Sequence, residues 1–77
     1  MMIARIEKYD GKFQLKRRAW NAFKRYDKGA YGTALFDGDL LKVPRGITVK
    51  IKCDRNGVIY TVDDNDLEWS PQPYCPV

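Results

Sequence analysis

The sequence predicts an α+β fold, in which a small, strongly bent antiparallel sheet or SH3-like barrel carries one basic amphipathic helix. Three observations lead to this prediction. Residues 47–62 alternate apolar and polar side chains around a turn dipeptide, and short apolar runs separated by turn residues recur along the chain. Between residues 15 and 27, apolar side chains instead recur at helical spacing within a basic segment. The length of 77 residues fits one domain.

Residues 47–62 are predicted to form a β-hairpin, around which the other elements are arranged. Alternation directs one face of the first strand to the core, with the inward positions at Ile47, Val49, Ile51 and Cys53. Asn56-Gly57 suits a two-residue hairpin loop, because both central positions of that turn need a positive φ. After the turn, Val58, Tyr60 and Val62 alternate with Ile59, Thr61 and Asp63, and most of these side chains favour strands.

The N-terminal part of the chain begins with a candidate strand at residues 2–9, followed by Asp10-Gly11. Residues 6–15 on their own predict a second hairpin, whereas the competing interpretation starts a helix near Gly11 with Asp10 as its N-cap. We predict a helix over residues 15–27, because apolar residues recur every three or four positions at Leu15, Ala19, Ala22, Phe23 and Tyr26.

The remaining elements are short strands separated by turns. Residues 33–36 and 40–43 flank Asp37-Gly38-Asp39, and Pro44-Arg45-Gly46 interrupts the chain before the hairpin. A polar turn at 63–66 precedes a closing strand at 67–69. Residues 70–77 contain three prolines, which cannot join a central strand. We therefore expect a single compact domain at 1–70 and an extended proline-rich tail at 71–77.

The strand spacing of residues 33–69 resembles that of SH3-like barrels, and Ala34-Leu35-Phe36-Asp37 resembles the opening of eukaryotic SH3 domains. The paired tryptophans of the SH3 peptide groove are absent, Gly38 replaces the second aromatic residue, and no proline-tyrosine signature follows. The resemblance is therefore one of architecture only, and it implies a barrel-like fold.

Composition argues against several function classes. The chain has no histidine and one serine, Ser70, so the usual serine and cysteine triads cannot be assembled, and no glycine-rich phosphate loop is present. We expect no enzymatic activity, no metal site and no cofactor. No apolar run approaches the length of a membrane helix, so a cytoplasmic location without membrane contact is expected. Cys53 is predicted to be a small core residue, and a bridge to Cys75 is left open.

Charge is unevenly distributed along the chain. Residues 1–28 carry nine Lys and Arg against three Asp and Glu, whereas residues 29–77 carry five against seven. The predicted helix presents five cations and one amide away from its apolar stripe: Lys16, Arg17, Arg18, Asn21, Lys24 and Arg25. We expect replacement of Lys16, Arg17 and Arg18 with Ala to leave the fold intact. Lys50 and Lys52 share the outward face of a hairpin strand, where they either contact a ligand or protect a sheet edge.

These features predict a non-enzymatic binding module. The first hypothesis is binding of single- or double-stranded nucleic acid through the basic helix and the Lys50/Lys52 strand face, with Asn21 available to read a base edge. The alternative is a small adaptor or inhibitor, of the type found as accessory proteins of phages or mobile elements, that docks on a larger protein. Its anchors would be exposed aromatic residues, namely Tyr31, Trp69 and Tyr74. The sequence does not predict an oligomeric state.

Overall fold

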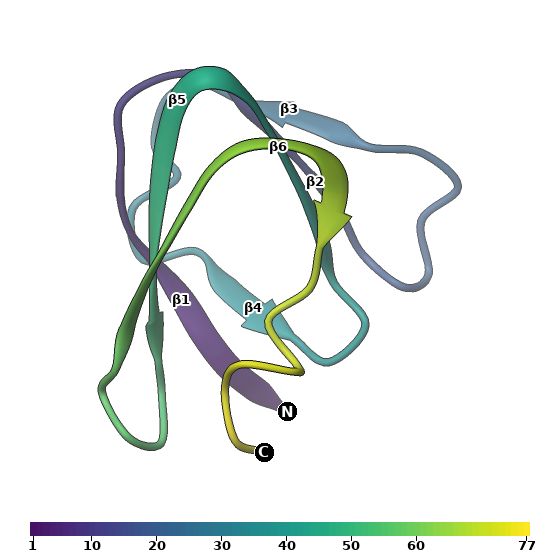
Figure 1. Ribbon diagram of the computed structural model, residues 1–77. Coiled ribbons are helices and arrows are strands. Elements are labelled where there is room, and N and C mark those ends of the chain that lie inside the picture. Colours follow the sequence, from purple (N-terminus) through teal and green to yellow (C-terminus); the bar gives the residue numbers. More distant parts are fainter.

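The computed structural model describes residues 1–63 and 68–77, and in these residues every regular element is a strand. The described part of the chain therefore contains no helix that is long and apolar enough to cross a membrane. The strands are antiparallel and form one curled sheet, a half-barrel (Figure 1). They are β1 (Met2–Tyr9), β2 (Phe13–Lys16), β3 (Lys24–Tyr26), β4 (Ala34–Phe36), β5 (Leu40–Cys53) and β6 (Ile59–Trp69).

The structure contradicts the α+β prediction, because the segment expected to form the basic helix is extended. Residues 15–27 comprise the end of β2, a loop and β3, and β2 pairs with β3 through Gln14–Arg25 and Leu15–Lys24. The other edge of β2 pairs with β5. Helical spacing of apolar residues is a weak local preference, which pairing on both edges of β2 overrides. The small residues that completed the predicted stripe, Ala19 and Ala22, are exposed in the loop.

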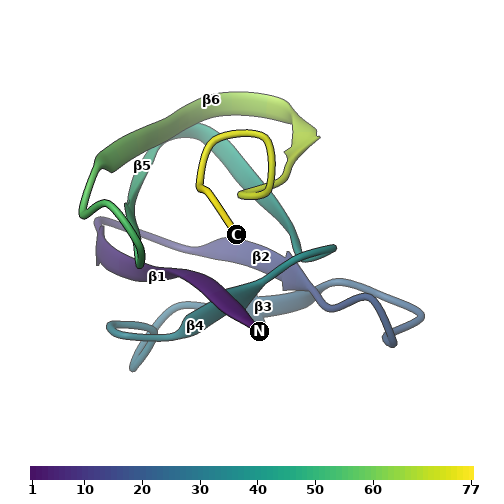
Figure 2. The same cartoon turned by 90° about the horizontal axis from the view of Figure 1, so that it is seen from below.

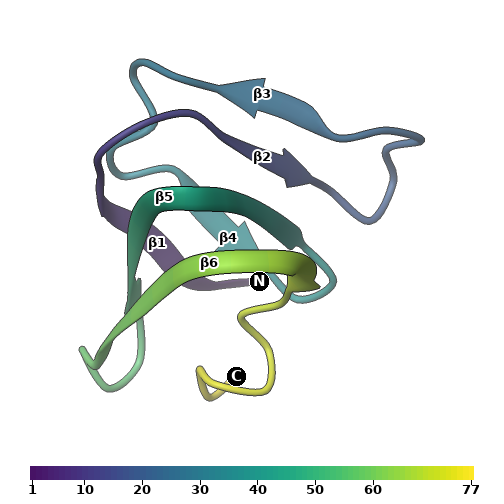
Figure 3. The same ribbon diagram turned by 45° about the horizontal axis from the view of Figure 1, so that its top comes forward.

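The long strand β5 is the centre of the sheet. Its first residues pair with β2 and its last residues pair with β1, while β6 lies along its opposite edge. Pro44-Arg45-Gly46 lies within β5, where the sequence predicted an interruption, and Gly46 adopts a positive φ of 87°. The strand arches at its middle instead of ending, and β6 arches beside it (Figures 1 and 3).

The predicted hairpin at residues 47–62 is confirmed. Strand β5 pairs with β6 through Val49–Val62 and Ile51–Tyr60, so the alternating residues of the two strands share one face. The loop is longer than predicted: the Cys53 amide donates a hydrogen bond to the Val58 carbonyl (2.8 Å), which encloses the four residues 54–57. The predicted polar turn at 63–66 lies mostly outside the described residues.

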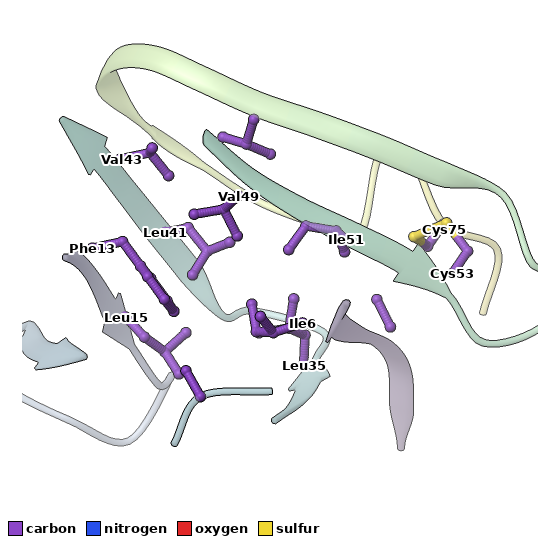
Figure 4. Packing of buried hydrophobic residues seen from close by; sticks show 13 residues of the cluster. Ile6, Phe13, Leu15, Leu35, Leu41, Val43, Val49, Ile51, Cys53 and Cys75 are labelled. Atoms are coloured by element: carbon purple, nitrogen blue, oxygen red, sulfur yellow. A yellow bond between two sulfur atoms is a disulfide. The ribbon is translucent and has the colours of Figure 1, made fainter. Parts of the chain in front are cut away.

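The core fills the concave side of the curled sheet (Figure 4). Alternation identifies its members on β2 and β5, because Phe13, Leu15, Val49 and Ile51 are all buried. Val58 lies at the end of the hairpin loop and is 41% exposed. Strands β1, β4 and β6 and the early part of β5 complete the core with Ile3, Ala4, Ile6, Leu35, Leu41, Val43 and Val62.

The C-terminal tail turns back into the open side of the half-barrel (Figure 2). Pro71 and Cys75 are buried, and the Cys75 amide donates a hydrogen bond to the Pro71 carbonyl (2.8 Å). A disulfide joins Cys75 to Cys53 at the end of β5. The tail is therefore turned and anchored, where the sequence predicted an extended conformation. Whether residues 1–70 fold without it stays a prediction.

Candidate anion-binding surface

Two cross-strand pairs of like charge, separated by an irregularity in the register of β1, lie on the outer face of β1 and β5. Arg5 is opposite Lys52, and Lys8 is opposite Lys50. Since Ile51 between the two lysines is buried, Lys50 and Lys52 both face outward, and both are exposed. We call these four residues, Arg5, Lys8, Lys50 and Lys52, the cationic ladder.

Like charges directly opposite one another in a sheet repel, although acidic residues border both pairs: Glu7 and Asp54 lie beside Arg5 and Lys52, and Asp10 lies beside Lys8 and Lys50. Arg5 is compensated by Asp54, with 3.0 Å between its guanidinium and the carboxylate, but both side chains are nearly half exposed and the pair is screened by water. Lys8, Lys50 and Lys52 form no ion pair with any residue that the structure describes.

Edge protection does not account for the two lysines of β5. Strand β5 is paired on both edges around these residues, with β1 on one side and β6 on the other. An interior strand exposes no free backbone groups to another chain, so it needs no charged side chains to prevent edge-to-edge association. The prediction that Lys50 and Lys52 protect a sheet edge is therefore wrong.

A second cationic feature lies on the outer face of β2, β3 and the first part of β5. Gln14 is opposite Arg25 on one side and Lys42 on the other, so these three residues form a row across three strands. The strands β3, β2 and β5 lie side by side in Figure 3. The row borders an open depression of about 510 Å³, which we call the basic hollow. Its lining residues are Lys12, Phe13, Gln14, Arg25, Lys42, Val43 and Pro44.

The cations of the basic hollow are available to a ligand. Within residues 1–63 and 68–77, Lys12, Arg25 and Lys42 form no ion pair, and no acidic side chain is among the residues that line the hollow. The Lys42 Nζ lies 4.3 Å from the centroid of the Phe23 ring, a cation–π contact that orients the ammonium group.

The cations predicted to share one helix are divided by the sheet between different surfaces. Arg25 lines the basic hollow, and Lys16 follows Gln14 on the same outer side of β2. Lys24 lies opposite Leu15, which points to the core, so it projects from the other side of β3. Lys50 and Lys52 belong to the cationic ladder on a different part of the sheet.

Arg17 has a structural role that the sequence prediction missed. Its guanidinium donates hydrogen bonds to the Ala34 carbonyl (2.8 Å) and to the carboxylate of Asp39, which is 2% exposed. It also lies over the rings of Phe36 (5.1 Å) and Trp20 (5.9 Å). Arg17 therefore links the loop after β2 to β4, and its guanidinium is occupied by these contacts and is not available to a ligand.

The other two residues predicted on the helix face lie in the same loop. Arg18 is 3.5 Å from the Asp37 carboxylate, with both side chains at least half exposed. Asn21 is exposed between β2 and β3. The role given to Asn21 in reading a base edge from a helix loses its structural basis, because no helix is present there.

The predicted protein anchors do not form one patch of free aromatic side chains. Tyr31 is 62% exposed and its ring packs against Tyr9 at 4.6 Å. Trp69 is partly buried and stacks on Tyr74 at 5.2 Å, while Tyr74 remains 47% exposed. Tyr74 and Trp69 therefore cover part of each other's surface.

Sequence reasoning missed half of the cationic ladder and most of the basic hollow. Arg5 and Lys8 lie in a strand that was expected, but its pairing with β5 has no local sequence signal. Lys12, Gln14 and Lys42 flank or alternate with the buried residues Phe13, Leu15 and Leu41, and that alternation is the signal that could have placed them on an outer face. No three metal-ligating side chains come together in the described part of the chain.

A scan against protein-family models, a search of curated proteins and a search of solved structures each find no match to this chain.

Proposed function

We propose that this protein is a non-enzymatic binding module that binds nucleic acid through its outer basic surface, formed by the cationic ladder and the basic hollow. The observation that carries the proposal is the ladder, in which Lys8 opposes Lys50 and Arg5 opposes Lys52 on an interior strand. The repulsion between opposed cations costs folding free energy to the extent that the neighbouring Glu7, Asp10 and Asp54 do not offset it, and the ladder protects no edge. A bound polyanion offsets the cost, because its phosphates neutralise the opposed cations.

A repeating anion fits this surface better than a single acidic group. Lys50 and Lys52 are two residues apart on one face of β5, which spaces their Cα atoms by roughly 6.5–7 Å. Arg5 and Lys8 provide a second row on the neighbouring strand. Lys12, Arg25 and Lys42 add cations farther along the same bent sheet. An extended chain of phosphates has charges enough to contact several of these positions.

The test is fluorescence anisotropy of labelled single-stranded and duplex oligonucleotides at two salt concentrations. We expect binding at low salt that weakens steeply as salt rises, because each phosphate contact releases counterions. Lys50→Gln should weaken binding, whereas Lys24→Gln, which removes the same charge from the other side of the sheet, should have a smaller effect. Absence of binding to either probe at the lowest salt contradicts the proposal.

That negative result would favour the second hypothesis, a small adaptor or inhibitor docked on a larger protein. Pull-downs with immobilised protein would then be compared with those of a Tyr31→Ala variant and a Tyr74→Ala variant. These two aromatic side chains are the most exposed of the three predicted anchors.

A cytoplasmic location remains part of the proposal and is testable through the cysteines. Glutathione and thioredoxin keep most cytosolic thiols reduced, so a cytoplasmic protein should carry Cys53 and Cys75 as thiols in the cell. The disulfide between them instead fits an oxidising compartment. Alkylation of free thiols at the moment of cell lysis, followed by mass spectrometry, distinguishes the thiol form from the disulfide form. A protein that is not alkylated because Cys53 and Cys75 are bridged contradicts the cytoplasmic location.

A further inference from the structure

Strand β6 carries an uncharged, strand-favouring segment on a free edge of the sheet. In the described part of the chain β6 pairs with β5 alone, and Figure 2 shows it as the outermost strand on its side. Residues 58–62 read Val-Ile-Tyr-Thr-Val, five side chains that all favour strands. An edge segment of this composition is suited to pair with a strand of another chain.

The register with β5 identifies the backbone groups that lie on this free edge. Because the Cys53 amide donates a hydrogen bond to the Val58 carbonyl, the hydrogen-bonded pairs with β5 continue at every second residue of β6. The amides and carbonyls of Ile59 and Thr61 therefore point away from β5. Within residues 1–63 and 68–77, these groups bond to no other segment, and the Ile59 side chain is 49% exposed.

The two strands at the other edges of the sheet are protected. At β4, the Ala34 carbonyl accepts a hydrogen bond from Arg17, and the amide and carbonyl of Phe36 bond to the side chain and amide of Asp39. Strand β3 is only three residues long and includes two cations, which disfavour pairing with another chain. Residues 58–62 have neither kind of protection.

We propose that residues 58–62 pair antiparallel with the same residues of a second copy of the chain, about a two-fold axis at Tyr60. In this register Ile59 of each copy lies opposite Thr61 of the other. Both residues present outward backbone groups, so they form hydrogen-bonded pairs across the interface. A two-fold interface must be self-complementary, and an antiparallel pair of identical strands meets that requirement.

The charges beside the paired segment favour a second copy as its occupant. Asp63 of one copy lies next to the hairpin end of the other, which carries Arg55, so opposite charges meet at both ends of the interface. The carboxylate of Asp54 in the same hairpin end is already paired with Arg5. The other register that aligns the outward groups, with its axis at Thr61, moves Asp63 away from Arg55.

The pairing joins two cationic ladders on one outer surface. Within each copy Ile59 is opposite Lys52 and Thr61 is opposite Lys50, so each row of the ladder continues across the interface. With strands about 4.8 Å apart, Lys52 of one copy is roughly 14 Å from Lys50 of the other. The gain in polyanion binding rests on the proposed function, whereas the pairing itself does not.

Sedimentation equilibrium of the full chain and two variants at position 61 tests the pairing. Thr61→Pro removes an amide that points away from β5, whereas Thr61→Val retains it. We expect the wild-type protein and Thr61→Val to dimerise with a dissociation constant between about 1 μM and 1 mM, since the paired segment is short, and Thr61→Pro to remain monomeric. A monomeric wild-type protein over this range, or a Thr61→Pro variant that dimerises equally, overturns the inference.

Cysteine cross-linking tests the register and does not depend on the folding of Thr61→Pro. Across the two-fold axis Tyr60 lies opposite itself, with its Cα atoms about 4.5 Å apart, within the range of a disulfide. Tyr60→Cys should therefore form covalent dimers under mild oxidation. Val58→Cys, whose Cα atoms are roughly 14 Å apart, should not, and it controls for exchange with the native disulfide. The same yield of covalent dimer from both variants overturns the register, and thermal melting checks that both are folded.

Anisotropy separates failure of this inference from failure of the proposed function. Thr61→Pro should bind a single-stranded oligonucleotide at least about tenfold less tightly than Thr61→Val, because two joined ladders hold one strand with avidity. Equal affinity of the two variants overturns the joined surface. Absence of binding by both variants and by the wild-type protein refutes the proposed function and leaves the pairing of β6 intact.

Discussion

At the scale of single residues, the pair formed by Arg17 and Asp39 links three separate segments. The Asp39 carboxylate accepts hydrogen bonds from the Arg17 guanidinium and from the Phe36 amide (2.8 Å), and it is 2% exposed. Removal of one partner from a buried ion pair leaves a charge without compensation, which is more costly than the loss of an exposed pair.

We expect Arg17→Ala to lower the free energy of unfolding by roughly 3 kcal/mol. Arg18→Ala removes the ion pair with Asp37, whose side chains are 72% and 50% exposed. This variant should change the free energy of unfolding by less than about 0.5 kcal/mol. Urea denaturation of both variants provides the measurement. Equal stability of the two would mean that Arg17 is only a surface cation, in line with the sequence-based prediction that replacement of Lys16, Arg17 and Arg18 with Ala leaves the fold intact.

The sequence predicted the local role of Asp39 better than that of Arg17. An aspartate in Asp37-Gly38-Asp39 is expected to accept hydrogen bonds within a turn, and the bond from the Phe36 amide fits that expectation. The partners of Arg17 lie 17 and 22 residues away, at Ala34 and Asp39. No local pattern encodes a contact across that separation.

At the scale of elements, the bend of β5 determines the shape of the sheet. The same strand pairs with β2 before Pro44-Arg45-Gly46 and with β1 after it. Gly46 has a φ of 87°, which side chains other than glycine rarely adopt. Sequence reasoning recognised these three residues as an irregularity but read it as an end, because proline and glycine signal both bends and breaks.

We expect Gly46→Ala to destabilise the protein by about 1–2 kcal/mol, the cost of a left-handed backbone for a residue with a Cβ atom. A Cβ at Gly46 would have no atom within 4 Å, so the effect isolates the backbone from steric crowding. Thermal unfolding measures it. An unchanged melting temperature would show that the bend does not depend on a positive φ at this position.

The tail is the second element whose behaviour is testable. The disulfide closes a loop with a sequence separation of 22 residues, and loss of that cross-link should cost about 3 kcal/mol through the entropy of the unfolded chain. A Cys53→Ser/Cys75→Ser variant should therefore melt well below the oxidised protein, and reductant should lower the melting temperature of the latter alone. If reductant has no effect, the two sulfurs do not constrain the chain.

The incorrect prediction of a helix over residues 15–27 is also explained by the pairing of elements. Two descriptions fitted the segment, since Phe13 and Leu15 alternate as in a strand whereas Leu15, Ala19, Phe23 and Tyr26 recur as in a helix. The segment is extended because β5 pairs with the second edge of β2, and β5 is distant in sequence. By contrast, the β5–β6 hairpin was predictable because both of its strands and its turn are adjacent in sequence.

At the scale of the whole molecule, the curled sheet determines which cations act together. The uneven charge distribution was visible in the sequence, but the grouping of Arg5 with Lys52 and of Lys8 with Lys50 depends on a register between β1 and β5. These residues are more than 40 positions apart, so the cationic ladder could not be assembled without the fold.

The number of phosphates contacted is measurable from the dependence of affinity on salt. For a single strand, the logarithm of the binding constant should fall with the logarithm of salt concentration by about 0.7 per neutralised phosphate. Lys50→Gln/Lys52→Gln should therefore reduce the slope by about one to two units, whereas Lys24→Gln should leave it nearly unchanged. An identical slope in the double variant would remove both lysines from the interface.

The most direct test of the central claim measures stability and affinity on the same variant, Lys50→Glu. The new carboxylate lies opposite Lys8, so a repulsive cross-strand pair becomes attractive and the free energy of unfolding should rise by about 0.5 kcal/mol. Affinity for a single-stranded oligonucleotide at low salt should fall at least tenfold. If the variant is more stable and binds less tightly, the result supports the claim that the cations of this surface bind a polyanion although they lower the stability of the fold. A variant that binds as tightly as the wild-type protein contradicts it.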